Sequence, residues 1–197
     1  YSRAPFVSVN LAAISFGMNV SWAAPMIPLL EGPNPPIGSE PMTQDETSWL
    51  TSVVSLPSIA ASPLAAWSCE RFGRKISIVS LGIPAMLNWI FIYFAQNFYY
   101  LLISRILVGI SGGMMLTLLP IYVGEIADPS VRGQLGGVLG FATNIGCFIT
   151  LLLGSILSYH DFAIAGIVPP AIFFITFMTM PETPEYLIRK GKLEEAT

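Results

Sequence analysis

The chain has 197 residues, of which 53% are hydrophobic and 11% charged, and its mean hydropathy is +0.67. The hydrophobic share and the mean hydropathy lie above those of water-soluble domains, and the charged share lies below. A basic surface for nucleic acid is missing, so a nucleic-acid-binding protein is excluded. The net charge of −3 says little about partners, because acidic and basic residues fall in different loops. The composition predicts a protein that is embedded in the lipid bilayer.

Six long stretches follow one another along the chain, each without charge or, in the fourth, with one charge inside the stretch. About 20 apolar residues at 1.5 Å rise cross a hydrocarbon core roughly 30 Å thick. The predicted fold class is therefore all-α, a polytopic membrane protein with six transmembrane helices. The spans are expected near 6–30, 47–68, 76–96, 100–124, 134–158 and 162–180, so that residues 1–180 form one bundle.

The basic residues predict the orientation of these spans. All of them except Arg105 lie in segments on one side of the membrane, whereas the opposite loops carry acids only. By the positive-inside rule both ends of the chain are expected in the cytoplasm. The segments in question contain Arg3, Arg71, Arg74, Lys75, Arg132, Arg189, Lys190 and Lys192.

The two ends of the chain and its cysteines add further expectations. The chain opens on Tyr1 and stops within "GKLEEAT", so we expect a fragment of a longer protein in which residues 181–197 begin a cytoplasmic helical linker. Cys69 and Cys147 are expected to be plain thiols, since neither has a neighbouring Cys or His for a metal site. No metal, cofactor or enzymatic motif is predicted.

Two short cytoplasmic links, "ERFGRK" (70–75) and "GEIADPSVRG" (124–133), bring charges to one membrane face. An acid at a helix C-terminus opposes the helix dipole, so Glu125 gains if Arg74 or Arg132 lies nearby. An ionic cluster is therefore expected; the alternatives are a simple basic anchor or a fixed structural ion pair. The cluster would draw on Glu70, Arg71, Gly73, Arg74, Glu125, Arg132 and Gly133.

Arg105 is the one cation deep within a predicted span. A charge in the membrane is costly and normally faces protein or a cavity, which makes Arg105 a functional candidate. The alternative is that its side chain reaches the outer membrane interface. Gly109 and Gly113 follow at helical spacing and predict close helix packing.

Three motifs resemble the sugar porter family of the major facilitator superfamily: "ERFGRK", "SRILVGISGG…LPIYVGEIADPSVRG" and "PETPEYL" (181–187). The resemblance covers nearly the whole chain. Within the family it is nearest the insect facilitated trehalose transporter type, through "TQDETSWL" (43–50) and "VRGQLGG…NIG" (131–146).

The resemblance implies the N-terminal half of a twelve-helix transporter, with a sugar held between two six-helix halves that rock to alternate access. The missing C-terminal half is then a partner. The resemblance also implies that the cytoplasmic charges, with Glu182 of the last motif, form a gate that is paired when the protein faces outward.

A sugar needs polar groups on inward faces, because it exchanges hydrogen bonds with water for bonds with protein. The candidates are Asn19 and Trp22 in the first span and Thr143 and Asn144 in the fifth. The alternatives are a packing role for Trp22 and interhelical hydrogen bonds for the two fifth-span residues. Gly140 stands where many hexose carriers of the family have Gln, which argues against glucose-like recognition.

Residues 6–30 contain no acid, whereas proton-driven members of the family carry an Asp in the first helix. The expected function is therefore facilitated transport of trehalose or another sugar, at the plasma membrane. Two alternatives stay open: a proton-coupled sugar symporter, and a non-transporting sugar sensor built on the same fold.

Overall fold

The computed structural model describes residues 4–38, 40–126 and 132–179, and within these residues the secondary structure is helical. The helices are α1 (Ala4–Ser21), α2 (Ala23–Leu30), α3 (Gln44–Ser52), α4 (Ser55–Phe72), α5 (Arg74–Tyr93), α6 (Phe98–Ile126), α7 (Arg132–Ile156) and α8 (Tyr159–Met178). Because α1 continues into α2 and α3 into α4, they make six membrane-length apolar rods. The predicted all-α class with six transmembrane helices is confirmed. The expected linker at 181–197 lies outside the described residues.

Prolines explain why two of the six rods are broken. The first rod is interrupted at Trp22 and the second at Val53 and Val54. Pro25 and Pro57 follow these breaks, and a proline has no N–H to donate to the carbonyl four residues earlier. Each break therefore leaves carbonyl oxygens inside a membrane span that need another donor.

Side-chain caps determine where two other helices begin. The Thr43 hydroxyl accepts from the Glu46 N–H and the Glu46 carboxylate accepts from the Thr43 N–H, so α3 begins ahead of the expected position 47. The Ser158 hydroxyl accepts from the Asp161 N–H, and α8 begins at Tyr159 rather than 162. A hydropathy pattern marks the apolar run, but it does not mark the polar residues that form the first turn of each helix.

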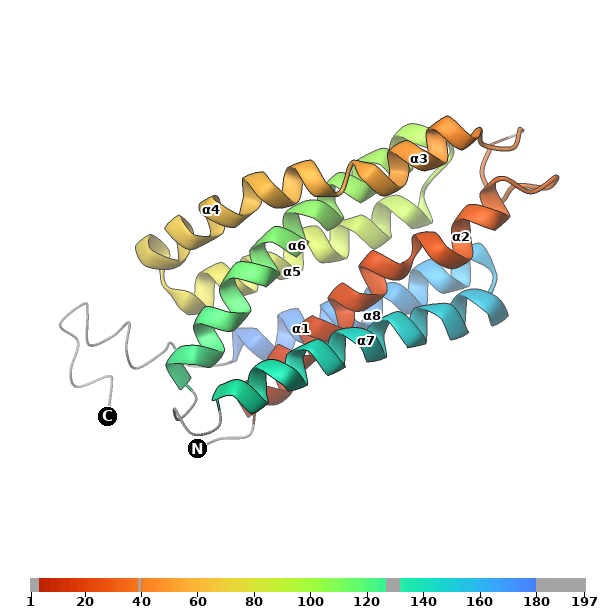
Figure 1. The fold of residues 1–197 in the computed structure, drawn as a ribbon. Coiled ribbons are helices and arrows are strands. Elements are labelled where there is room, and N and C mark those ends of the chain that lie inside the picture. Colours follow the sequence, from red (N-terminus) through yellow and green to blue (C-terminus); the bar gives the residue numbers. More distant parts are fainter. Residues whose placement is uncertain (1–3, 39, 127–131, 180–197) are drawn as a thin grey trace.

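The six rods run antiparallel to their neighbours in sequence, as Figure 1 shows. α6 packs extensively against α4 and α5, α1 packs against α7 and α8, and α5 joins the two groups through α8. The turn at Gly73, the start of α1 and the end of α8 lie at one end of the bundle, which we call the Gly73 end. The loop that contains Gly38 lies at the other, the Gly38 end.

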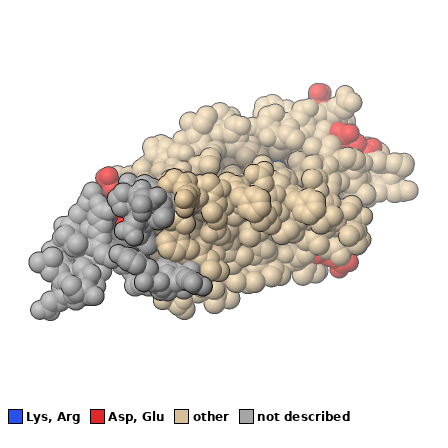
Figure 2. All heavy atoms as spheres, turned by 60° about the horizontal axis from the view of Figure 1, so that its bottom comes forward, with Lys and Arg blue, Asp and Glu red and all other residues tan. Residues whose placement is uncertain are grey.

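The surface agrees with a bilayer-spanning protein. Figure 2 shows acidic side chains at the two ends and uncharged side chains over nearly all the length between them. The rods differ in burial: 56% of the residues in the apolar window of α6 are buried, against 17% in the α3–α4 rod and 22% in α7. The α3–α4 rod and α7 therefore present broad faces outside the described bundle.

Glycines allow the closest helix contacts. A Cβ atom on Gly17 would overlap the carbonyl oxygen of Thr143 on α7, and one on Gly146 would overlap that of Ile14 on α1. Gly109 and Gly113 of α6 lie equally close to carbonyl oxygens of the α3–α4 rod, as their predicted packing role requires. Gly137 of α7, in contrast, has no atom within 4 Å of the position a Cβ would take.

This contrast predicts opposite effects for one substitution at two sites of the same helix. Gly146→Ala forces α1 and α7 apart and should destabilise the protein by about 1–3 kcal/mol. Gly137→Ala meets open space and should be neutral or stabilise the helix by up to about 1 kcal/mol. Thermal unfolding of the purified variants in detergent measures both, and equal melting temperatures would contradict the packing described here.

Candidate functional site

At the Gly73 end an ion pair joins α5 to α6. The guanidinium of Arg74 forms a bidentate contact with Glu125: Nη2 lies 2.7 Å and Nε 2.9 Å from Oε1, and Nε lies 3.1 Å from Oε2. Nη1 also donates to the carbonyl oxygen of Cys69, at 3.1 Å. The two side chains are only 6% and 11% exposed, so water screens the pair weakly.

The turn between α4 and α5 sets this geometry. Gly73 adopts φ +102°, a conformation that residues with a Cβ rarely take, and it lets the chain reverse within one residue. Arg74 is consequently the first residue of α5 and points back under Cys69 at the end of α4. The Glu125 carboxylate comes from the last turn of α6, where the helix dipole disfavours an anion unless a cation faces it.

The other expected members of the cluster lie differently. Glu70 is exposed, and so is Arg71, whose guanidinium stacks over the Trp67 ring at 5.2 Å. Gly133 is exposed on the first turn of α7. The Arg132 side chain and Glu182 lie outside what the structure describes. Of the expected members, the structure brings Arg74 and Glu125 together, beside the Gly73 turn.

Arg105 lies inside the bundle, 1% exposed, and not at a membrane interface. Its Nη1 donates to the carbonyl oxygen of Asn19 at 3.0 Å, and its Nη2 donates to Oδ1 of Asn88 at 3.1 Å. The guanidinium carbon sits over the Trp22 ring, 4.5 Å from its centroid. Three helices and the α1–α2 break therefore meet at this one side chain.

The contacts that the structure gives this cation are dipoles and a ring face rather than a carboxylate. The Asn19 carbonyl belongs to the last turn of α1, where carbonyls lack partners within the helix and the dipole is negative. A cation at that position caps the helix and gains a charge-assisted hydrogen bond. The Trp22 ring adds a cation–π contact that is strengthened by burial.

Asn19 and Trp22 therefore occupy the interior. Asn19 is 1% exposed and Trp22 is fully buried, so the Trp22 ring faces Arg105 and is closed to a sugar in this conformation. Asn88 of α5 was not anticipated: its Nδ2 donates to Asn19 Oδ1 at 2.8 Å. A lone amide within the apolar run "MLNWIF" was the signal that could have marked it, because such groups need a partner in a membrane.

Thr143 and Asn144 lie on α7, the helix that packs against α1. Thr143 is partly buried and donates to the Leu139 carbonyl at 3.0 Å, while Asn144 is exposed and donates to the Gly140 carbonyl at 2.9 Å. Thr143 borders a groove of about 410 Å³ between α6 and α7, where it is the one polar side chain of the lining. Met115, Leu119, Val123, Gly136 and Gly140 form much of the remainder.

The sequence and the fold together define a multi-pass membrane protein, and comparison with known proteins identifies its class. Residues 6–197 match the model of the family described as "Sugar (and other) transporter". The chain belongs to this family, the sugar porters of the major facilitator superfamily. The members of the family are transporters rather than enzymes.

Two curated relatives illustrate the range of similarity. The chain is 34% identical over 186 residues to solute carrier family 2, facilitated glucose transporter member 8, of Bos taurus, covering 94% of this chain and 38% of the relative. It is 30% identical over 190 residues to facilitated trehalose transporter Tret1 of Apis mellifera ligustica, covering 96% of this chain and 38% of the relative. The chain thus spans well under half the length of these relatives.

The solved structures agree on the fold. The xylose transporter XylE from E. coli, in a partially occluded inward-open conformation, superposes with a TM-score of 0.81 at 17% sequence identity. The match covers 98% of this chain and 51% of the XylE chain. At this identity the match shows the fold alone, which is one six-helix half of the transporter.

The buried contacts of Arg105 predict that Asn88 is needed for stability. Asn88→Leu removes the acceptor of Nη2 and the donor to Asn19, and each buried polar group left without a partner costs about 1–3 kcal/mol. Thermal unfolding should therefore show a melting temperature well below that of the parent. The same change at exposed Asn144 is the control, expected within about 0.5 kcal/mol. Similar melting of both variants would contradict the network.

Proposed function

We propose that the chain forms the N-terminal half of a facilitative sugar carrier, in which trehalose or another sugar crosses the plasma membrane by alternating access. The observation that carries the proposal is the family match over residues 6–197. Relatives named for glucose and for trehalose support a sugar substrate without selecting one. The second half of the transporter would come from chain beyond these residues.

The environment of Arg105 supports uniport rather than proton symport. A proton-coupled cycle needs a group that binds and releases a proton, and a carboxylate beside a buried cation would be suited to that task. Here the contacts given for Arg105 are a carbonyl, an amide and an indole ring, none of which titrates near neutral pH. The positive charge then stays constant through the transport cycle.

The polar groups for sugar are assigned to both halves. Thr143 and Asn144 on α7 are the polar side chains we assign to this half, next to the α6–α7 groove. One threonine in a lining of apolar side chains and glycines offers a sugar few hydrogen bonds. Most of the required donors and acceptors would therefore come from the C-terminal half, which faces the same groove in our proposal.

The ion pair between Arg74 and Glu125 is assigned to the cytoplasmic gate, with both ends of the chain on that side. The positive-inside distribution supports the orientation. The pair holds the ends of α5 and α6 together while the cytoplasmic side is shut, and it separates as the halves rock. Losing about 1.4 kcal/mol of this contact would shift the conformational equilibrium roughly tenfold toward the inward-open state.

The coupling proposal predicts uptake that runs only downhill. Labelled sugar in cells that express the full-length protein should equilibrate without exceeding the external concentration, and a proton ionophore should not change its rate. Accumulation that collapses with the ionophore would contradict uniport. Absence of uptake by protein that reaches the surface would contradict a carrier and favour a sensor.

A carboxylate introduced beside Arg105 should make transport depend on pH. In Asn19→Asp the new carboxyl group takes the place of the amide that contacts Asn88, one hydrogen bond removed from the guanidinium, so it is stabilised by the cation when ionised and loses that attraction when protonated. Uptake by this variant should vary with pH between about 4 and 7, while uptake by the parent stays flat over the same range. Identical pH profiles for the variant and the parent would contradict the idea that uniport results from the lack of a titratable group beside Arg105.

The gate proposal predicts slower net uptake with normal folding. Glu125→Gln weakens the pair, so the variant should reach the surface, transport more slowly, and expose cysteines engineered near the Gly73 end to modification. Exchanging the pair, Arg74→Glu with Glu125→Arg, should restore part of the activity, since the Cys69 contact of Arg74 is still lost. Surface-normalised uptake and cysteine accessibility are measured together.

Two comparisons sharpen this experiment. Glu40→Gln, an exposed acid in the loop at the Gly38 end, is the matched control and should behave as the parent. Glu70→Gln tests whether the gate extends beyond the pair, because Glu70 is exposed in this conformation. A Glu125→Gln variant that fails to reach the surface, with normal transport by the molecules that do, would assign the pair a structural role instead.

A further inference from the structure

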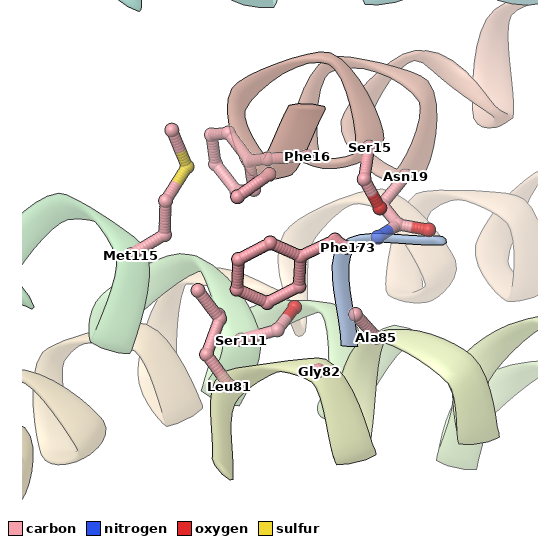
Figure 3. Close-up of a pocket in the computed structure, with 10 residues that line it drawn as sticks. Ser15, Phe16, Asn19, Leu81, Gly82, Ala85, Ser111, Met115 and Phe173 are labelled. Carbon is pink, nitrogen blue, oxygen red and sulfur yellow. The ribbon is translucent and has the colours of Figure 1, made fainter. Parts of the chain in front are cut away.

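A small cavity lies inside the bundle between α1, α5, α6 and α8. Its volume is about 10 Å³, roughly one water-sized probe sphere. Figure 3 shows the residues that border it, among them Ser15, Phe16, Asn19, Ser111, Met115 and Phe173. Most of this lining is apolar, so the few polar atoms that face the cavity determine what it can hold.

Two of those polar atoms are buried and have no protein partner among the described residues. They are the Ser15 hydroxyl oxygen and the Asn19 amide nitrogen, in residues that are 3% and 1% exposed. Figure 3 shows the two atoms turned toward the same side, one helical turn apart on α1. Leaving each of them without a hydrogen bond would cost about 1–3 kcal/mol.

The hydrogen bonds from Arg105 dictate which kind of atom can complete the site. A guanidinium only donates, so Asn88 must present its oxygen to Arg105 and its nitrogen to Asn19. Asn19 in turn uses its oxygen to accept from Asn88, which leaves its nitrogen directed toward the cavity. The chain of donors therefore runs from Arg105 to Asn88 to Asn19 and ends on an N–H that needs an acceptor.

We propose that this cavity is a binding site for a single hydroxyl-type oxygen, which accepts a hydrogen bond from Asn19 Nδ2 and forms a second with the Ser15 hydroxyl. A metal cation is excluded by chemistry, since the site offers a donor that is polarised by Arg105. A bare anion would lose its hydration for two partners in an apolar setting. Water and a carbohydrate hydroxyl share the required chemistry.

The bound oxygen has a consequence for Arg105. Asn88 holds the Asn19 amide in one orientation, because a flipped amide would present its nitrogen to the Asn88 nitrogen, and the bound oxygen satisfies the N–H that this orientation leaves facing the cavity. That orientation keeps Asn88 aligned for Arg105. Phe16 at the border is only half-buried, so the oxygen can exchange with the face of the bundle on that side. Only the carbohydrate source of the oxygen rests on the proposed function.

Thermal unfolding of Ser15→Ala in the full-length protein tests the site by the sign of the effect. If the Ser15 hydroxyl binds the proposed oxygen, its removal should lower the melting temperature by about 2 °C or more. If the hydroxyl is unsatisfied, its removal should leave the melting temperature unchanged or raise it. Ser104→Ala is the matched control, because Ser104 is equally buried but already donates to the Leu101 carbonyl at 2.7 Å.

A high-resolution structure of the parent protein without sugar supplies the second measurement. An oxygen peak about 2.7–3.2 Å from both Ser15 Oγ and Asn19 Nδ2, with a larger melting loss in Ser15→Ala than in Ser104→Ala, supports the site with water as the source. The same peak found only with bound trehalose or glucose, continuous with its ring, identifies a carbohydrate hydroxyl.

The remaining outcomes overturn the proposal. One is a structure with no oxygen peak at this position, with or without sugar. The other is a fall in melting temperature for Ser15→Ala that does not exceed the fall for Ser104→Ala. Failure of sugar uptake, in contrast, would remove the proposed function and leave the water site standing, so the two failures are distinguishable.

Discussion

The cost of holding Arg105 in the membrane interior governs the arrangement around it. A buried cation is tolerated only when hydrogen bonds and opposing dipoles replace its hydration. The bundle supplies such contacts from three directions, namely the open carbonyl at the end of α1, the Asn88 oxygen on α5 and the face of Trp22, while Arg105 Nε has no partner among the described residues. The break in the first rod is part of the solution, because it frees the carbonyls that an unbroken helix would keep for itself.

α6 connects this interior site to the ion pair at the Gly73 end. It carries both Arg105 and Glu125, and each of them contacts α5, through Asn88 and through Arg74. Its glycines bring it against the α3–α4 rod at the same time. α7 is attached differently, mainly through its close contact with α1, and one side of its first half meets no neighbour among the described residues. The bundle therefore has a closely packed centre and open flanking faces.

Hydropathy predicted the six rods because the need to match a bilayer dominates the sequence. The same energetic argument marked Arg105 and the pairing of Glu125 with a neighbouring arginine, since an isolated charge in either place would be unstable. The partners of Arg105 were not predicted, because helical periodicity assigns residues to a face without giving the rotation or depth of the helix. The sequence therefore marks Trp22 as a sugar candidate although its ring lies beneath the guanidinium, and it does not single out Asn88.

The two charge sites differ in a way that suits them to different tasks. Arg105 is compensated by backbone and neutral side chains from helices packed around it, and separating it from them would leave a cation in an apolar interior at a cost of several kcal/mol. Arg74 and Glu125 sit where the rods end, so a modest displacement exposes both ions to water and recovers their hydration. The barrier to breaking the peripheral pair is correspondingly lower. The interior charge is therefore suited to holding the bundle together, whereas the pair at its end is suited to the gating role proposed above, because its ions can part without being stranded in an apolar interior.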